Sequence, residues 1–163
     1  MYQAAIITAS DKGASGKRKD ESGAVVRQML EEAGYAIHSQ LLLPDERDQL
    51  AEAMRQLCDH DAVDLIITTG GTGFSPRDVT PEATLDVVER QAPGLAEAMR
   101  WASLEITKRA MLSRAVAGIR QQTLIINLPG SPKAAAENLA VVLPELAHGL
   151  AVLRGESGDC ARS

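Results

Sequence analysis

The residues in this sequence that are best placed to do chemistry follow an apolar run at positions 65–69. This run is mostly branched and carries no charge, which is typical of a strand buried on both faces of a parallel sheet. Gly70, Gly71 and Gly73 come directly after it. Because glycine adopts positive φ readily and exposes its N–H group, this turn predicts an anion-binding site.

A short polar arm, Ser75-Pro76-Arg77-Asp78, follows the glycine turn. It carries one cation and one carboxylate, and the spacing of a Walker A loop is absent from the segment. Since Asp78 is not at a helix-cap position, we favour a functional role for it over that of a solvated turn residue. Phe74 is interpreted as a plug that packs the arm onto the body of the protein.

The segment Thr80-Pro81-Glu82 has the composition of a helix start. Thr80 is predicted to be the N-cap and Pro81 the first helical residue, with Glu82 close to the positive end of the helix dipole. We expect this helix to extend over about residues 81–90.

Polar residues also follow three other predicted strands, at residues 4–9, 37–43 and 123–128. They are Ser10 and Asp11, Pro44 and Asp45, and the run Pro129, Gly130, Ser131, Pro132 and Lys133. Ligands of open parallel sheets bind outside the carboxyl ends of the strands. The sequence therefore predicts that these turns and the glycine turn form one binding rim.

A phosphorylated ligand fits this rim. Amides of the glycine turn and of Gly130 and Ser131 would face the phosphates near helix N-termini. Arg77 and Lys133 would supply positive charge.

The carboxylates Asp11, Asp45 and Asp78 suit such a ligand when Mg²⁺ lies between them and the phosphates. Mg²⁺ accepts one or two carboxylates while it keeps phosphate oxygens and waters. For Asp45, a purely structural role as a helix cap is the alternative.

Between the predicted strands, apolar residues recur at helical spacing, for example at Val26 and Leu30 and at Leu50 and Met54. Gly34 is placed to end the first of these helices, and Pro144 is expected to kink or restart the last one. Strands that alternate with helices predict an α/β fold with a mostly parallel central sheet covered on both faces.

The composition favours one acidic domain. The 163 residues carry a formal charge of −5, with a pI near 5.2. This charge disfavours a general nucleic-acid binder, and the basic run at residues 17–19 is interpreted as a solvated loop. We expect a domain over residues 1–155, a flexible tail at 156–163, no membrane partner and a cytoplasmic location, since no signal-like or membrane-length segment is present.

Several other residues receive no chemical role. Cys58 is expected in the core and Cys160 in the tail, and neither has metal-ligand spacing. Trp101 lies either in the core or at a subunit contact. No partner is predicted for the histidines, which are His38, His60 and His148.

Four motifs together resemble the molybdopterin-binding family of molybdenum-cofactor biosynthesis. They are Thr-Thr-Gly-Gly-Thr-Gly at 68–73, Arg-Asp-Val-Thr-Pro-Glu-Ala at 77–83, Leu-Ser-Arg at 112–114 and Leu-Pro-Gly-Ser-Pro-Lys at 128–133. The resemblance extends from Ile6 to about Gly155. It is strongest to the molybdopterin adenylyltransferase branch, which is favoured by Leu-Pro-Asp-Glu at 43–46 and Pro-Gly-Ser-Pro-Lys at 129–133.

The resemblance implies an α/β/α sandwich, a homotrimer, and Mg²⁺-dependent transfer of AMP from ATP to the terminal phosphate of molybdopterin, with release of pyrophosphate. Transient contact with the molybdenum-insertion enzyme is part of the same expectation. Asp45 and Asp78 are implied as catalytic and metal-binding residues. The implied substrate-binding residues are Ser10, Asp11, Gly70, Gly71, Thr72, Gly73, Arg77, Thr80, Glu82, Ser113, Pro129, Gly130, Ser131 and Lys133.

Two alternatives remain beside this interpretation. The chain resembles a sister branch that binds molybdopterin without an assigned activity. It is also compatible with a non-catalytic trimeric scaffold that binds a phosphorylated ligand in the same place. Either protein would release no pyrophosphate from ATP.

Overall fold

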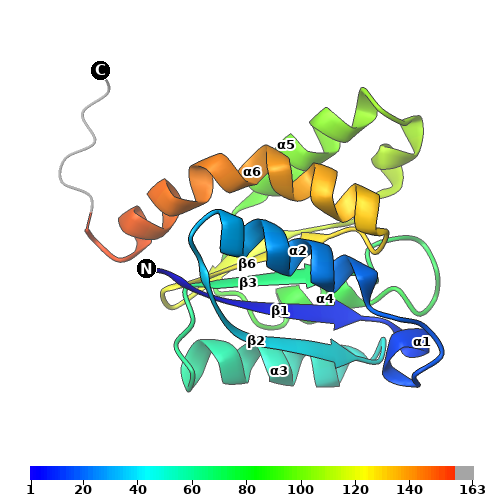
Figure 1. Ribbon diagram of the computed structural model, residues 1–163, viewed down its shortest axis with the longest axis horizontal. Helices are drawn as coiled ribbons and strands as arrows, with labels where there is room; N and C mark the ends of the chain where they lie inside the picture. Colours follow the sequence, from blue (N-terminus) through cyan, green and yellow to red (C-terminus); the bar gives the residue numbers. More distant parts are fainter. Residues whose placement is uncertain (157–163) are drawn as a thin grey trace.

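The computed structural model describes residues 1–156, which form an α/β fold around a six-stranded sheet (Figure 1). The order is β2 (Ala36–Leu43), β1 (Gln3–Ala9), β3 (Leu65–Thr69), β6 (Thr123–Leu128), β5 (Ala117–Arg120) and β4 (Arg90–Gln91). The first four of these strands are parallel, whereas β5 and β4 pair antiparallel at the far edge. The predicted fold class, with a mostly parallel sheet, is confirmed.

Helices cover both faces of the sheet, which makes three layers (Figure 1). One face carries α2 (Glu21–Glu32), α5 (Pro93–Leu104) and α6 (Pro132–Leu153). The other carries α3 (Arg47–Asp59) and α4 (Thr80–Leu85). Alternate residues of the strands point into the two cores, so that Ile6 and Ile67 face the first layer while Ile7 and Ile66 face the second.

The parallel strands end together at one edge of the sheet. Ala9 of β1 pairs with Leu43 of β2, and Thr69 of β3 pairs with both Thr8 and Leu128. The turns that follow these strands therefore lie side by side, as predicted. The short helices α1 (Asp11–Ala14) and η1 (Lys108–Leu112) lie in connections between the main elements.

The helix after the polar arm differs from the prediction. It starts at Thr80 with Val79 as the N-cap, and no side chain makes a capping hydrogen bond. The predicted capping role of Thr80 is wrong because its side chain is fully buried in the helix's first turn. The helix ends at Leu85 instead of near residue 90, because Arg90 and Gln91 pair with β5.

The last helix, α6, continues through Pro144 without a restart. Its buried residues lie on both sides of this proline and belong to one core, which offsets the lost backbone hydrogen bond. Among the described residues, α6 is long and apolar enough by length and composition to cross a membrane. Leu139, Val142 and Leu146 are buried against the sheet layer, although only 28% of the apolar stretch is buried in the described structure.

Several side chains lie elsewhere than expected. Trp101 is 74% exposed, which excludes a core position in this chain. Phe74 is 69% exposed, so the interpretation as a packing plug is wrong. His38 has a partner, since its Nε2 lies 3.2 Å from Asp61 Oδ2. Cys58 is buried as predicted, and burial raises the pKa of its thiol to about 11. Most of the predicted tail, including Cys160, lies outside the described residues.

Candidate functional site

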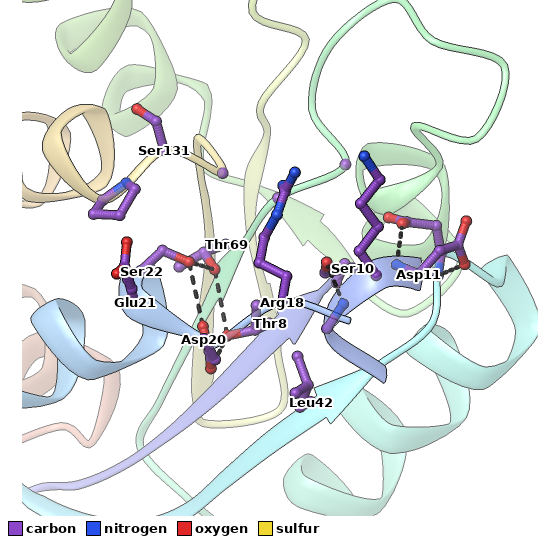
Figure 2. A pocket seen from close by; sticks show the side chains of 18 of the residues that line it. Thr8, Ser10, Asp11, Arg18, Asp20, Glu21, Ser22, Leu42, Thr69 and Ser131 are labelled. Atoms are coloured by element: carbon purple, nitrogen blue, oxygen red, sulfur yellow. Dashed lines mark hydrogen bonds between the residues drawn. The ribbon is translucent and has the colours of Figure 1, made fainter. Parts of the chain in front are cut away.

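A cavity of about 760 Å³ opens at the carboxyl edge of the parallel strands (Figure 2). Turns from all the parallel strands contribute to it, together with the first residues of α2 and α6. The cavity brings together many of the predicted site residues, namely Ser10, Asp11, Asp45, Gly70, Gly71, Arg77, Asp78, Gly130 and Ser131.

Glycines allow the turns to approach one another at this edge. Gly70 and Gly71 have φ values of +88° and +67°. A side chain at Gly70 would collide with the carbonyl oxygen of Ala9, and a Cβ at Gly130 would lie 3.2 Å from the Gly70 Cα. The N–H of Gly70 donates to the Leu128 carbonyl at 3.1 Å, so this amide holds two strand exits together.

Asp45 lies at the end of β2, where it pairs with Asp11 at the end of β1. The Asp11 N–H donates to Asp45 Oδ2 at 2.9 Å, and the Asp45 N–H donates to Asp11 Oδ1 at 3.0 Å. Glu46 is the N-cap residue of α3, and no side chain makes a capping bond there. The alternative role of Asp45 as a helix cap is therefore wrong, because its carboxylate accepts the Asp11 N–H in the turn after β1 instead.

The carboxyl group of Asp45 is destabilised in its charged form. Burial contributes most to raising its pKa, the hydrogen bond from the Asp11 backbone opposes this, and the negative charges of Asp11 and Asp78 raise it further. Asp78 lies beside Gly73 of the glycine turn, where its Oδ2 accepts the Ser75 N–H at 2.9 Å. The two carboxylates thus influence each other within one cavity.

The donor set fits a hard divalent cation that also binds a phosphorylated ligand. Within residues 1–156, no group of three or more His, Cys, Asp or Glu side chains is arranged to hold a metal by itself. Mg²⁺ does not require such a cage, because it commonly uses one or two carboxylates with phosphate oxygens and waters. Asp45 and Asp78 offer that number of carboxylates, and a cation would relieve their repulsion.

Arg77 binds carboxylates of the protein. Its Nε and Nη2 donate to the two oxygens of Asp11, each at 3.0 Å, and Nη2 also donates to Glu46 at 2.8 Å. The hydrogen bond from Arg77 is the main cause of the lowered pKa of Asp11. The guanidinium predicted for phosphates is thus directed at acidic side chains in this structure.

The other side of the cavity is lined by hydroxyl groups that the sequence analysis missed (Figure 2). The Ser22 and Thr69 hydroxyls lie 3.0 Å apart, and the Thr8 hydroxyl donates to Asp20 Oδ2 at 2.8 Å. Asp20 also caps α2 through the Gly23 N–H at 2.9 Å. The pattern Asp-x-Ser-Gly before an amphipathic helix was the available signal for this part of the site.

Arg18 and Lys19 line the same cavity, although their basic run was interpreted as a solvated loop. Figure 2 shows Arg18 between the cluster of hydroxyl groups and the turn at Ser10 and Asp11. Both side chains belong to exposed residues. Both residues supply positive charge to the cavity. Arg77 is paired with Asp11 and Glu46, whereas no ion pair among residues 1–156 involves Arg18 or Lys19.

Other predicted residues lie outside this cavity. Ser113, Thr72, Gly73 and Pro129 line a second, smaller cavity of about 270 Å³ beside α5. The Lys133 side chain is 85% exposed and lies 4.0 Å from Glu137.

Thr80 and Glu82, which were also predicted to bind substrate, do not line the first cavity and lie against other protein groups. The Thr80 hydroxyl is buried close to Gly71 and has no hydrogen-bond partner within residues 1–156. Glu82 forms an ion pair with Arg114, and this pairing contributes to lowering its pKa against the effect of burial. Arg114 also donates to the carbonyls of Gly73 at 2.7 Å and Asp78 at 2.6 Å, so it holds both ends of the polar arm. The sequence analysis assigned Arg114 no role.

The fold and the cavity define a class, which is the doubly wound α/β proteins that bind a ligand outside the carboxyl ends of parallel strands. The pattern of a family described as "Probable molybdopterin binding domain" matches residues 5–148. The chain belongs to this family of molybdopterin-binding domains, which confirms the resemblance found in the sequence.

Individual relatives agree with this assignment. The molybdopterin adenylyltransferase of Helicobacter pylori J99 is 40% identical over 153 residues, covering 92% of this chain and 86% of the relative. That of Escherichia coli K12 is 40% identical over 137 residues, covering 82% and 70%. The crystal structure of the molybdopterin biosynthesis enzyme MoaB from Thermus thermophilus has a TM-score of 0.90 at 46% identity, covering 95% of this chain and 98% of that one.

Proposed function

We propose that this protein is a molybdopterin adenylyltransferase, which transfers AMP from ATP to the terminal phosphate of molybdopterin and releases pyrophosphate. The observation that carries the proposal is the cavity itself, where two mutually repelling carboxylates face hydroxyl groups, cations and two helix N-termini. Relatives that bear this enzyme name support the choice of reaction.

The reaction joins two phosphorylated molecules. A terminal phosphate oxygen of molybdopterin attacks the α-phosphorus of ATP, and the bond from that phosphorus to the bridging oxygen breaks. Pyrophosphate leaves with that bridging oxygen, and the AMP group stays on the pterin phosphate. A phosphate nucleophile is largely deprotonated at neutral pH, so this chain needs to supply no general base.

The protein's contribution is positioning and charge. We assign Asp45 and Asp78 to hold Mg²⁺, which when bound would neutralise charge on the phosphates. Amides at the N-termini of α2 and α6 and the side chains of Arg18 and Lys19 would face phosphate oxygens. Such fixed donors favour the reaction because they are already oriented before charge moves.

The second cavity suits a flatter and less charged part of the substrates. Its lining combines apolar residues, such as Ile106 and Leu112, with the polar residues Ser113 and Asn138. It carries fewer charged residues than the first cavity, namely Arg100, Arg109 and Glu137. Thr72 and Gly73 of the glycine turn line this cavity, whereas Gly70 and Gly71 line the first one. We therefore assign it to the pterin side of the reaction, which would give Ser113 a part in the substrate binding expected for it.

We also propose that the protein is a homotrimer, that it acts in the cytoplasm, and that it contacts the molybdenum-insertion enzyme transiently. Exposed apolar side chains concentrate in the segment from α5 to η1, where Trp101 is 74%, Ile106 59% and Met111 62% exposed. Exposed apolar groups of this kind are typical of surfaces that other subunits cover.

One specific observation favours a second candidate, a pterin-binding protein without transferase activity. A solved structure named for molybdopterin biosynthesis but not for adenylyl transfer is 46% identical to this chain. The two candidates differ in a single assay with purified protein, molybdopterin, ATP and Mg²⁺. An adenylyltransferase forms adenylylated pterin and pyrophosphate in equal amounts. A binding protein retains the pterin and forms neither product.

A further inference from the structure

We propose that Asp11 is a positioning residue that holds the two candidate metal-binding carboxylates in their relative places. It fixes Asp45 directly, and it fixes the arm that carries Asp78 through Arg77. The inference rests on the proposed function, and it replaces the substrate-binding role expected for Asp11.

The first connection joins the ends of β1 and β2. Asp11 and Asp45 exchange two hydrogen bonds, each from the backbone N–H of one residue to the carboxylate of the other, at 2.9 and 3.0 Å. This exchange fixes both the backbone and the carboxylate of Asp45. A substitution of the Asp11 side chain affects only the bond that this side chain accepts, since the other is donated by the Asp11 backbone.

The second connection joins the end of β1 to the polar arm. Arg77 donates to both oxygens of Asp11 in a bidentate pair, and it also reaches Glu46, the residue next to Asp45. Arg77 directly precedes Asp78 in the chain. A bidentate pair constrains orientation as well as distance, so the contact limits where the Asp78 backbone lies.

The arm has few other contacts at its tip. Phe74, Ser75 and Pro76 are exposed, whereas Arg114 holds the base of the arm through the carbonyls of Gly73 and Asp78. The position of the tip therefore depends on Arg77 and Asp11. An exposed ion pair contributes little to overall stability, but its loss here would remove the restraint next to Asp78 and leave Arg114 to hold that residue through its carbonyl.

The hydrogen bonds of Asp11 also argue against direct contact with a substrate. Its Oδ1 accepts from both Asp45 and Arg77, and its Oδ2 accepts from Arg77. Both oxygens are thus engaged by protein donors, and neither is directed at a substrate by the contacts of the described chain.

The test compares Asp11→Asn with Asp86→Asn. Asp86 forms a similar bidentate pair with Arg47 on the surface and is outside both cavities, so it is a matched control. We expect Asp11→Asn to lower kcat by about tenfold or more, with KM for ATP changed less than about twofold, because misplacement affects turnover more than binding. Hydrogen exchange of the Ser75 and Asp78 amides should become faster in Asp11→Asn and stay unchanged in Asp86→Asn.

A double variant separates positioning from direct contact. If Asp11 acts through Arg77, Asp11→Asn combined with Arg77→Gln loses little more activity than the more severe single variant. The inference would be overturned if the activity losses of the two single variants multiplied in the double variant. It would also be overturned if the Ser75 and Asp78 amides exchanged at the parent's rate in Asp11→Asn. A parent protein that forms no pyrophosphate would refute the proposed function instead, while the exchange measurement still decides whether Asp11 holds the arm.

Discussion

The two edges of the sheet each carry a carboxylate withdrawn from solvent, buried for Asp64 and half-buried for Asp45, and the surroundings of the two differ. At the amino edge, Asp64 is only 5% exposed and is paired with Arg154 at the end of α6, with the Gln3 N–H also donating to it at 2.7 Å. At the carboxyl edge, Asp45 has no cationic partner within ion-pair distance in the described chain and lies near two other negative charges. A satisfied buried acid indicates structure, whereas a repelled one indicates a binding site.

The largest expected effect is on turnover at the carboxyl edge. We predict that Asp78→Asn lowers kcat by about 10²- to 10³-fold, because a neutral amide cannot hold the cation that neutralises the phosphates. The melting temperature should remain close to that of the parent, since Asp78 is only partly buried. Initial rates of pyrophosphate release check this, and a variant within about threefold of the parent would remove Asp78 from the chemistry.

The next effect is on stability at the amino edge. We predict that Asp64→Asn destabilises the fold by about 2 kcal/mol, because the buried Asp64 side chain would lose its charge-assisted hydrogen bonds from Arg154, which is partly exposed and keeps Glu156 at 3.5 Å. Activity per folded molecule should not change. Urea unfolding measures the difference, with Glu31→Gln as a control, since Glu31 forms an exposed pair with Arg27. Equal midpoints for the two variants would contradict the comparison.

A smaller effect is expected for the cation over the cavity. Arg18→Gln should raise KM for ATP by about two- to fivefold, the scale of one exposed charge contact, and leave kcat unchanged. Lys17→Gln is the matched control, because Lys17 is adjacent in sequence but does not line the cavity. The difference between the two variants should shrink at high salt, which screens exposed charges. Equal KM values at low salt would exclude Arg18 from the site.

The smallest effect is a change in stability with pH. Burial and neighbouring charge raise the pKa of folded Asp45 above its unfolded value, so its ionisation disfavours the folded state. That penalty is absent in acid and grows as pH rises through the folded pKa. Without metal, Asp45→Asn should therefore melt slightly higher than the parent at about pH 7 and equally at about pH 3.

Melting curves at both pH values measure the change. A lower melting temperature for Asp45→Asn at neutral pH would show that its hydrogen bond to Asp11 outweighs the repulsion. The contrast with Asp64→Asn would then disappear, because both substitutions would destabilise the fold.

Much of the fold could be predicted because its signals are local. The uncharged run of β3, the stop at Gly34 and the turns after the strands follow from residue type alone, and parallel strands place those turns on one edge. The shared location of Asp45, Asp78 and Gly130 was predictable for this reason.

The rest depended on contacts between distant residues. Sequence does not reveal that Arg77 turns toward Asp11 and Glu46, or that Arg114 reaches the arm, because side-chain partners are set by tertiary packing. The same holds for Thr80, whose cap-like sequence is overridden by burial next to Gly71. The predicted end of the helix after the polar arm was wrong, because Arg90 pairs with β5 instead of continuing the helix.

The most direct test of the account is a crystal structure with Mg²⁺ and a non-hydrolysable ATP analogue. We predict a metal bound at about 2.0–2.1 Å to oxygens of Asp45 or Asp78 and to the phosphates, with the triphosphate between the Gly70 and Gly130 turns. A nucleotide in the cavity beside Ser113, or a cation that contacts neither carboxylate, would contradict it.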